Sequence, residues 1–302
     1  ISGKCLLDLV LNFAYIFEVS EAEIIAMGDA PENKDNLIET VQIEAPAQSA
    51  PIVCVMDSGI QEEHKYLAPA ISSDESISLL PNNTGTSDDV AGGGHGTRVA
   101  GAVLYPKAVP SDGVYQLPCW IRNMRILDEN NCLPENVYPP KAIAIAVQKY
   151  NVENQNPTKI FNHSIGSRRA CEMKHMTPWA AEIDSQSYNH DVLFIQAAGN
   201  ISTDVISAYW QAGYPYPEYF DRELCRISNP AQSLQAITVG SVSAEELETD
   251  DFIALGKHME VSSFSRSGPG IWDVLKPEVV EYGGTHMYNK GSVPPQLTTP
   301  PE

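Results

Sequence analysis

The sequence predicts an α/β protein with a mostly parallel sheet and helices on both of its faces. Short apolar runs alternate with segments whose apolar residues recur at helical spacing, an alternation typical of a parallel sheet covered by helices. The predicted strands are residues 52–56, 119–127, 159–163, 192–197 and 236–242, and the predicted helices are residues 97–105, 140–150 and 179–188. Because right-handed crossovers bring the carboxyl ends of parallel strands to one edge, we expect the functional residues there.

The first predicted strand leads directly to a carboxylate. Residues 51–60 (PIVCVMDSGI) form an unbroken apolar run that ends in Asp57 and a turn, which is typical of a buried parallel strand. We therefore expect Asp57 at the carboxyl edge of the sheet. A carboxylate in that position can accept a hydrogen bond from an imidazole, orient the ring and stabilise its charged form.

The first predicted helix follows a glycine-rich segment and His95. Val99 and Val103 lie four residues apart and share one helical face, which places His95 at or near the amino end of the helix. Gly96 and Gly101 lower the helix propensity of this segment. We expect both glycines to allow close contact between the helix and its neighbours.

The second helix and the amino-terminal region are predicted from other signals. Apolar residues repeat at helical spacing within residues 140–150, and the pair of prolines at 139–140 is a helix start signal. Residues 1–50 are interpreted as the end of an upstream or prosegment-like region plus a linker, because residues 29–50 are rich in Pro, Asn, Glu and Ala. The main domain is predicted to span residues 51–302.

Composition excludes several classes of partner. The formal net charge of −20 argues against a nucleic-acid partner, and no apolar segment has the length of a membrane span.

The six cysteines lack metal-binding spacing. We expect free thiols and a cytoplasmic location, since no secretory signal is visible.

Four segments together resemble one family. Residues 55–60 (VMDSGI) and 95–101 (HGTRVAG) resemble the Asp and His signatures of the subtilisin-like serine proteases, the subtilases or peptidase S8 family. Residues 162–166 (NHSIG) resemble the substrate-binding strand of that family, and residues 196–200 (QAAGN) resemble the segment that carries its oxyanion-hole asparagine. The motifs also occur in the family's order.

The resemblance implies a subtilisin-like fold and a serine endopeptidase that acts on a peptide or protein substrate. Asp57 would orient His95, His95 would act as general base and acid, and Asn200 would donate to the oxyanion. The residues implied to line the substrate cleft are Ser164, Ile165, Gly166, Ala198 and Gly199. No cofactor is implied for the reaction. A calcium site is a common accessory in subtilases, and Asp74, Asp88 and Asp89 are candidate ligands.

The nucleophile of the triad is missing from the expected place. Subtilases carry it in a Gly-Thr-Ser segment that opens a helix, and no such segment follows Asn200. Residues 283–286 (GGTH) offer a histidine instead. We expect the catalytic domain to be truncated before the serine, and this fragment alone to be inactive. Residues 264–270 and 276–284 also resemble bacterial intracellular subtilases, some of which are linked to AAA-type ATPases.

Two alternative functions stay open. A degenerate, non-catalytic subtilase-like protein would bind peptides or a partner and would bind them equally well without His95. A metal-dependent hydrolase would use His95, Asp57 and nearby aspartates, although these residues lack ligand spacing.

Overall fold

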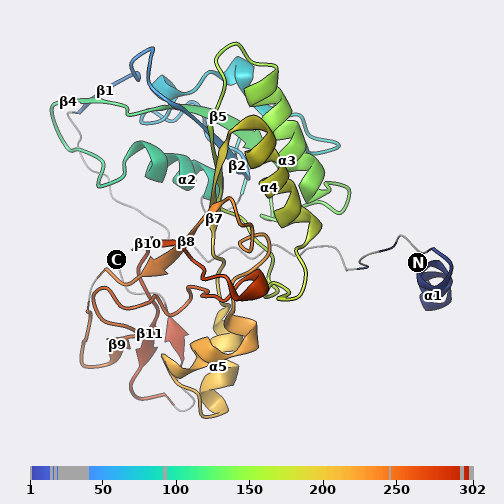
Figure 1. The fold of residues 1–302 in the computed structure, drawn as a ribbon. Helices are drawn as coiled ribbons and strands as arrows, with labels where there is room; N and C mark the ends of the chain where they lie inside the picture. Colours follow the sequence, from blue (N-terminus) through green and yellow to red (C-terminus); the bar gives the residue numbers. More distant parts are fainter. Residues whose placement is uncertain are drawn as a thin grey trace.

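The centre of the protein is a seven-stranded parallel sheet with the order β10-β8-β7-β6-β2-β5-β3 (Figure 1). The computed structural model describes residues 2–13, 16, 19, 41–90, 94–244, 246–292 and 296–298. The strands are β2 (Ile52–Asp57), β3 (Ile77–Ser78), β5 (Trp120–Arg125), β6 (Ile160–His163), β7 (Leu193–Ala197), β8 (Ile237–Val242) and β10 (Val279–Tyr282). Every neighbouring pair is parallel. The predicted fold class is therefore confirmed.

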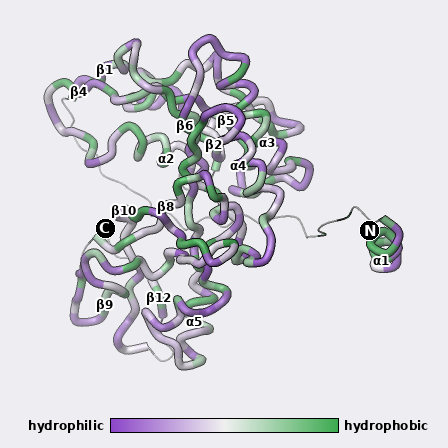
Figure 2. Tube along the Cα trace, viewed as in Figure 1, coloured by the Kyte–Doolittle hydropathy of each residue, from purple (hydrophilic) through white to green (hydrophobic). Residues whose placement is uncertain are grey.

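Helices cover both faces of this sheet, as predicted. Helix α2 (His95–Leu104) packs on one face against a cluster that includes Val53, Val55 and Ile121. Helices α3 (Pro139–Val147) and α4 (Pro178–His190) pack on the other face. Because side chains alternate along a strand, successive residues of β2 supply both cores. Figure 2 shows hydrophobic (green) stretches of the chain among the strands at the centre of the main body.

All of the predicted strands and helices are present, with ends within a few residues of those expected. Helix α3 continues as a turn of π-helix over Gln148–Val152. Short 3₁₀ helices occupy Ala68–Ala70, Ser73–Glu75, Glu218–Asp221, Glu223–Cys225 and Ile271–Asp273.

Several short elements at the periphery were not predicted. Strands β1 (Gln42–Glu44) and β4 (Val114–Gln116) pair in parallel, so β1 joins the main body from inside the predicted linker. Strands β9 (Phe252–Ala254), β11 (Met287–Asn289) and β12 (Leu297–Thr298) form an antiparallel sheet. Helix α5 (Thr203–Gln211) follows β7.

Helix α1 (Gly3–Asn12) lies in the predicted upstream region. None of its residues is buried, and it lies apart from the rest of the chain in Figure 1. Most of the predicted linker, residues 29–40, lies outside the described residues, as do residues 92–93 of the glycine-rich segment. Within the described ranges, no helix has the length and apolar character that crossing a bilayer requires.

Candidate active site

Asp57 is the last residue of β2 and lies at the carboxyl edge of the sheet, as expected. Its side chain is only 1% exposed. The backbone N–H of Ser58 donates to Oδ1 of Asp57 at 2.8 Å. A buried carboxylate needs such donors, because leaving it without partners is strongly unfavourable. Asp57 is thus held rigidly in a position from which it can orient another group.

His95 is the group that Asp57 orients. Nδ1 of His95, the first residue of α2, lies 2.8 and 2.9 Å from the two carboxylate oxygens of Asp57. This geometry assigns the Nδ1 proton to the hydrogen bond with Asp57 and leaves Nε2 as the acceptor. The His95 side chain is 27% exposed, so the imidazole joins a buried carboxylate to the surface.

A second buried carboxylate, Asp88, anchors the start of α2. Its Oδ2 accepts from the backbone N–H of Thr97 at 2.9 Å and from the Thr97 hydroxyl at 2.8 Å. Its Oδ1 accepts from the hydroxyl of Ser58 at 3.0 Å, and that hydroxyl accepts from the N–H of Gly96 at 3.0 Å. A carboxylate at a helix amino terminus also interacts favourably with the helix dipole. Asp88 therefore holds the turn that carries His95.

Two glycines around His95 make these contacts possible. A Cβ on Gly94 would overlap the carboxylate of Asp88, and a Cβ on Gly96 would overlap the carbonyl of Gly59. The expectation of close packing is thus confirmed for Gly96. At Gly101 the described residues make no such contact, since none of their atoms would lie within 4 Å of a Cβ there.

The predicted cleft residues follow β6 and β7, the two strands beside β2. Ser164, Ile165 and Gly166 come directly after β6, and Ala198, Gly199 and Asn200 come directly after β7. Since the strands are parallel, both segments leave the sheet at the edge that holds Asp57. Within the described residues, no hydrogen bond engages the side-chain amide of Asn200. That amide therefore has donors available for a ligand.

The two cleft segments are tied together from beneath. The side-chain amide of Gln196 donates to the carbonyls of Ile165 at 2.9 Å and Ala197 at 3.0 Å. Ser228 lies between the segments, because a Cβ on Gly166 would be 2.8 Å from its hydroxyl and a Cβ on Gly199 would overlap it. Both glycines are needed for this close approach, and Gly199 also has a φ of +98°.

His163 lies below the cleft and is a buried, neutral histidine. Its Nδ1 lies 2.6 Å from Oε1 of Gln196, and its ring meets Trp179 edge to face. Burial lowers the pKa of His163 to about 4. The hydrogen bond to Gln196 opposes that shift, as does the negative charge of Asp57, so His163 helps to fix Gln196 without titrating near neutral pH.

The sequence contains one Gly-Thr-Ser segment, residues 85–87, upstream of His95. It does not open a helix. The carbonyl of Thr86 accepts from the backbone N–H of Ile60 and from the side chain of Asn123, and Ser87 is exposed. Among the described residues, the imidazole of His95 has only Asp57 as a hydrogen-bond partner. This segment therefore does not complete a triad in the structure.

The candidate calcium ligands each have a separate partner. Asp88 binds Thr97 and Ser58, Asp89 pairs with Arg125 at 2.8 Å, and exposed Asp74 accepts from the Ser72 hydroxyl. No group of three or more metal-binding side chains occurs in the part of the chain that the structure describes. These aspartates do not fit a shared cation site.

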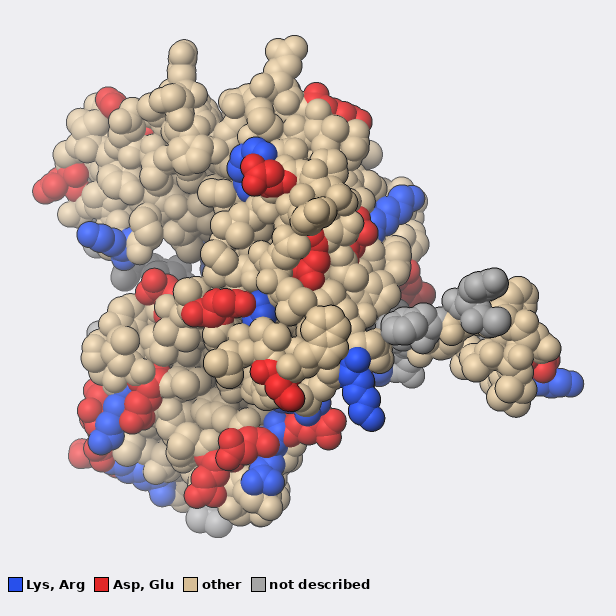
Figure 3. All heavy atoms as spheres, in the orientation of Figure 1, with Lys and Arg blue, Asp and Glu red and all other residues tan. Residues whose placement is uncertain are grey.

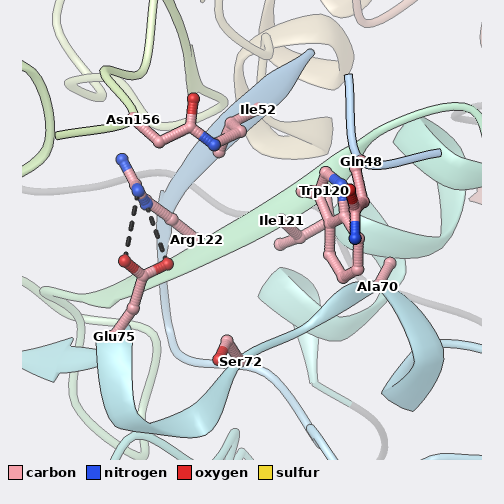
Figure 4. A pocket seen from close by; sticks show the side chains of 9 residues that line it. All are labelled: Gln48, Ile52, Ala70, Ser72, Glu75, Trp120, Ile121, Arg122 and Asn156. Atoms are coloured by element: carbon pink, nitrogen blue, oxygen red, sulfur yellow. Dashed lines mark hydrogen bonds and ion pairs between the residues drawn. The ribbon is translucent and has the colours of Figure 1, made fainter. Parts of the chain in front are cut away.

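A pocket of about 200 Å³ lies at the opposite, amino-terminal edge of the sheet (Figure 4). Its buried cation, Arg122, pairs with Glu75 at 3.2 Å and donates to the carbonyl of Tyr150 and the hydroxyl of Thr158. Because the charge of Arg122 is already balanced by Glu75, the pocket has no unpaired cation to recognise an anionic ligand.

Sequence reasoning named Asp88 only as a candidate calcium ligand and assigned no role to the side chains of Gln196, Ser228 or Arg266. Asp88 precedes a glycine-rich turn and a helix, which is a weak capping signal. The other three have no local signal, because their partners lie far away in the sequence.

Comparison with known proteins gives a family match over most of the chain. A model of the subtilase family, Peptidase S8, matches residues 48–301. The uncharacterized protein y4bN of Sinorhizobium fredii (strain NBRC 101917 / NGR234) is 30% identical over 138 residues, which cover 43% of this chain and 32% of that protein. The chain thus matches about a third of the length of this relative.

Solved protease structures are also similar. The S41 psychrophilic protease has a TM-score of 0.51 at 20% identity, with 85% of this chain and 72% of that chain covered. A cold-adapted subtilisin-like serine proteinase has a TM-score of 0.49 at 18% identity, with 82% and 68% covered. The first of these similarities shows a shared fold.

Proposed function

The chain belongs to the subtilase family, and we propose that it carries the aspartate, the histidine and the oxyanion-binding asparagine of a serine endopeptidase. The observation that carries the proposal is the contact between Nδ1 of His95 and the buried carboxylate of Asp57, at 2.8 and 2.9 Å. An imidazole held through Nδ1 presents an unprotonated Nε2 to a nucleophile.

In the proposed reaction, a serine hydroxyl attacks the carbonyl carbon of a peptide bond while Nε2 of His95 accepts its proton. The negative charge of Asp57 stabilises the imidazolium that forms. The side-chain amide of Asn200 donates to the oxygen on which negative charge develops. His95 then gives the proton to the leaving amine, and water releases the acyl group by the same steps.

The cleft residues would bind the substrate as an extended peptide. By the family resemblance, Ser164, Ile165 and Gly166 would offer backbone groups on one side, and Ala198 and Gly199 would line the other. Backbone hydrogen bonds of this kind recognise the main chain of a peptide and leave selectivity to the side chains. The substrate class is therefore a peptide or an unfolded segment of a protein.

We place the nucleophilic serine on a segment outside Ile1–Glu302 that packs beside α2. Helix α2 covers only part of its face of the sheet. On β7, β8 and β10 the same face carries apolar side chains that stay partly exposed, namely Leu193, Ile195, Ile237, Val239 and Val279. Figure 3 shows the surface hollowed between the part that carries α2 and the part that carries β10.

Gly101 of α2 supports the same placement. A Cβ at Gly101 would meet no atom within 4 Å, although glycine lowers helix stability by about 1 kcal/mol relative to alanine. Small residues on a helix allow a second segment to approach closely. A helix that docked here would begin or end at the edge of the sheet where His95 lies.

The test is labelling of the full-length gene product with a fluorophosphonate probe, which reacts with activated serines. We expect labelling of the wild type and none for His95→Ala, because the serine then lacks its base. Asn200→Ala should lower turnover of a peptide substrate by about 100- to 1,000-fold. His258→Ala, which alters an exposed histidine elsewhere, should keep full labelling and is the matched control.

A folded full-length protein that is not labelled would refute the proposal. If that protein bound peptides equally well with and without His95→Ala, the non-catalytic alternative would be correct. Activity insensitive to chelators would remove the metal-dependent alternative.

Two further expectations belong to this proposal. The first is a cytoplasmic location, in which the reducing environment would keep the six cysteines as the free thiols that the structure has. Association with an AAA-type ATPase, which the sequence resemblance implies, stays a prediction.

A further inference from the structure

Arg266 is a buried cation that binds backbone carbonyls. It is 3% exposed and follows the segment that pairs with the oxyanion-hole region. Its Nε donates to the carbonyl of Asn200 at 3.0 Å, and its Nη2 donates to the carbonyl of Arg168 at 2.7 Å. Its Nη1 donates to the carbonyls of Leu224 at 2.6 Å and Arg226 at 2.9 Å. Within the described residues, no carboxylate pairs with it.

This arrangement is unfavourable for stability on its own. A buried guanidinium loses its hydration, and carbonyl dipoles replace it less completely than a carboxylate would. In agreement, burial lowers the pKa of Arg266. An apolar side chain of similar length would avoid this loss of hydration. We therefore expect Arg266 to serve the geometry of the site and not the stability of the fold.

The side chain of Arg266 links the two segments that line the cleft. Arg168 follows the substrate-binding residues Ser164–Gly166 by two positions, and Asn200 carries the candidate oxyanion donor. The fork of one guanidinium reaches both, and its planar shape fixes the spacing of the carbonyls that it binds. The two segments follow separate strands, β6 and β7, and Gln196 is a second link between them.

The backbone of Arg266 strengthens the hold on Asn200. Its N–H donates to the carbonyl of Gly199 at 3.1 Å, and the N–H of Ile201 donates to the carbonyl of Phe264 at 2.7 Å. Asn200 is therefore bracketed by hydrogen bonds on both sides, while its own carbonyl is held by the guanidinium. Rotation of the Asn200 backbone, which would turn its side chain away, is opposed at three points.

We propose that Arg266 is a positioning residue that fixes the backbone of Asn200, and thereby keeps the Asn200 side-chain amide aimed at the developing oxyanion. The inference rests on the proposed function, since it assigns Arg266 a role in the same reaction. A donor displaced by about 1 Å can lose about 100-fold in rate. Arg266 acts through Asn200 and does not itself touch the substrate.

The first test measures amide hydrogen exchange in the 302-residue chain and needs no activity. Arg266→Gln should lower the protection of the Ile201 and Ser228 amides by about tenfold or more. The nearby carbonyls of Asn200 and Arg226 then lose the guanidinium that holds them. Arg122→Gln is the matched control, as it removes an equally buried guanidinium at the opposite edge of the sheet. It should instead affect the amide of Thr158, which donates to the carbonyl of Tyr150.

The second test is a double-mutant cycle in the full-length protein. Arg266→Gln should lower kcat by about 10- to 100-fold with little change in KM, and Arg266→Lys, which keeps the charge but not the fork, should give a smaller loss. In the Asn200→Ala background, Arg266→Gln should change kcat by less than about twofold, because the group that it positions is already gone.

The outcomes separate the two proposals. An equal loss of kcat in both backgrounds, or unchanged exchange of the Ile201 and Ser228 amides, would overturn the role of Arg266 while the endopeptidase stood. If the wild type were not labelled by a fluorophosphonate, the proposed function would fail, and the exchange measurement would still decide whether Arg266 holds Asn200. Should Arg266→Gln not fold, Arg266→Lys carries both tests.

Discussion

Asp88 and Thr97 are joined by two hydrogen bonds to one carboxylate oxygen, one from the backbone of Thr97 and one from its hydroxyl, at 2.9 and 2.8 Å. Thr97 is the third residue of α2, so Asp88 satisfies a backbone donor that the helix itself cannot satisfy. His95 lies two residues earlier. The orientation of the imidazole therefore depends on a carboxylate that does not touch it.

Replacing Asp88 should destabilise the protein and impair catalysis together. Asp88→Ala leaves the donors of Thr97 and Ser58 without their acceptor, which should lower the free energy of unfolding by about 1–3 kcal/mol. In the full-length protein, kcat should fall by about tenfold or more, since His95 loses its anchored turn. Chemical denaturation and peptide hydrolysis are the two measurements.

Asp74→Ala is the control for this substitution. Asp74 is exposed and accepts one hydrogen bond from Ser72, so its loss should change stability by less than about 0.5 kcal/mol and leave kcat unchanged. Similar behaviour of the two variants would show that Asp88 does not hold the start of α2.

Gly96→Ala and Gly101→Ala should have opposite effects on the 302-residue chain. Both positions lie in α2, where alanine raises helix propensity by about 1 kcal/mol. At Gly101 nothing opposes that gain, so the variant should be more stable. At Gly96 the new Cβ would overlap the carbonyl of Gly59 and lie 3.0 Å from Cβ of Asp57, so the variant should be less stable. Thermal unfolding of both variants decides the point.

The same Gly101→Ala variant should behave differently in the full-length protein. If a serine-bearing segment packs against α2, the added methyl group separates the two and lowers fluorophosphonate labelling. Equal or better labelling of Gly101→Ala would exclude the proposed docking of that segment at Gly101.

His163 should make the protein less stable in acid. Burial lowers its pKa to about 4 from 6.5, so between these pH values the unfolded chain binds a proton that the folded protein does not. Stability from this group is complete above about pH 6.5 and is lost as the pH falls toward 4, by up to about 3 kcal/mol.

The measurement is the free energy of unfolding of His163→Gln and wild type between pH 4 and 7.5. The difference between the two proteins should shift in favour of the variant as the pH falls, because glutamine does not titrate. His258→Gln, at an exposed histidine, should parallel the wild type. A constant difference between His163→Gln and wild type across this range would contradict the prediction.

The central strands could be predicted from the sequence because they are long enough to show a pattern. Strands β2 and β5 are buried along most of their length, and β7 and β8 alternate between buried and partly exposed residues. Strands β1, β3, β9, β11 and β12 have two or three residues each, too few to define a period. Strand β10 is exposed at every residue, so no apolar alternation marks it.

The site was predictable only where local signals exist. A carboxylate at the end of a buried strand identified Asp57, and a glycine-rich turn before a helix identified His95. Arg266 contacts Asn200, which is 66 positions away, and Arg168, which is 98 positions away. Such contacts depend on how the strands are ordered in the sheet, which local spacing does not encode. Gly101 shows the reverse case, since its local pattern suggested a contact that the described residues do not make.

Gly199→Ala should destabilise the chain more than Gly213→Ala, although both glycines have a positive φ, of +98° and +91°. The backbone strain is shared and costs about 1–2 kcal/mol at each position. Only at Gly199 would the new Cβ overlap the Ser228 hydroxyl and lie 2.9 Å from Cδ of Arg266, whereas at Gly213 it meets no atom within 4 Å. That overpacking should add about 1–3 kcal/mol to the loss in the free energy of unfolding. Ser228→Gly should recover part of it in the Gly199→Ala background, and equal losses at the two glycines would show that Ser228 does not fill the space between the cleft walls.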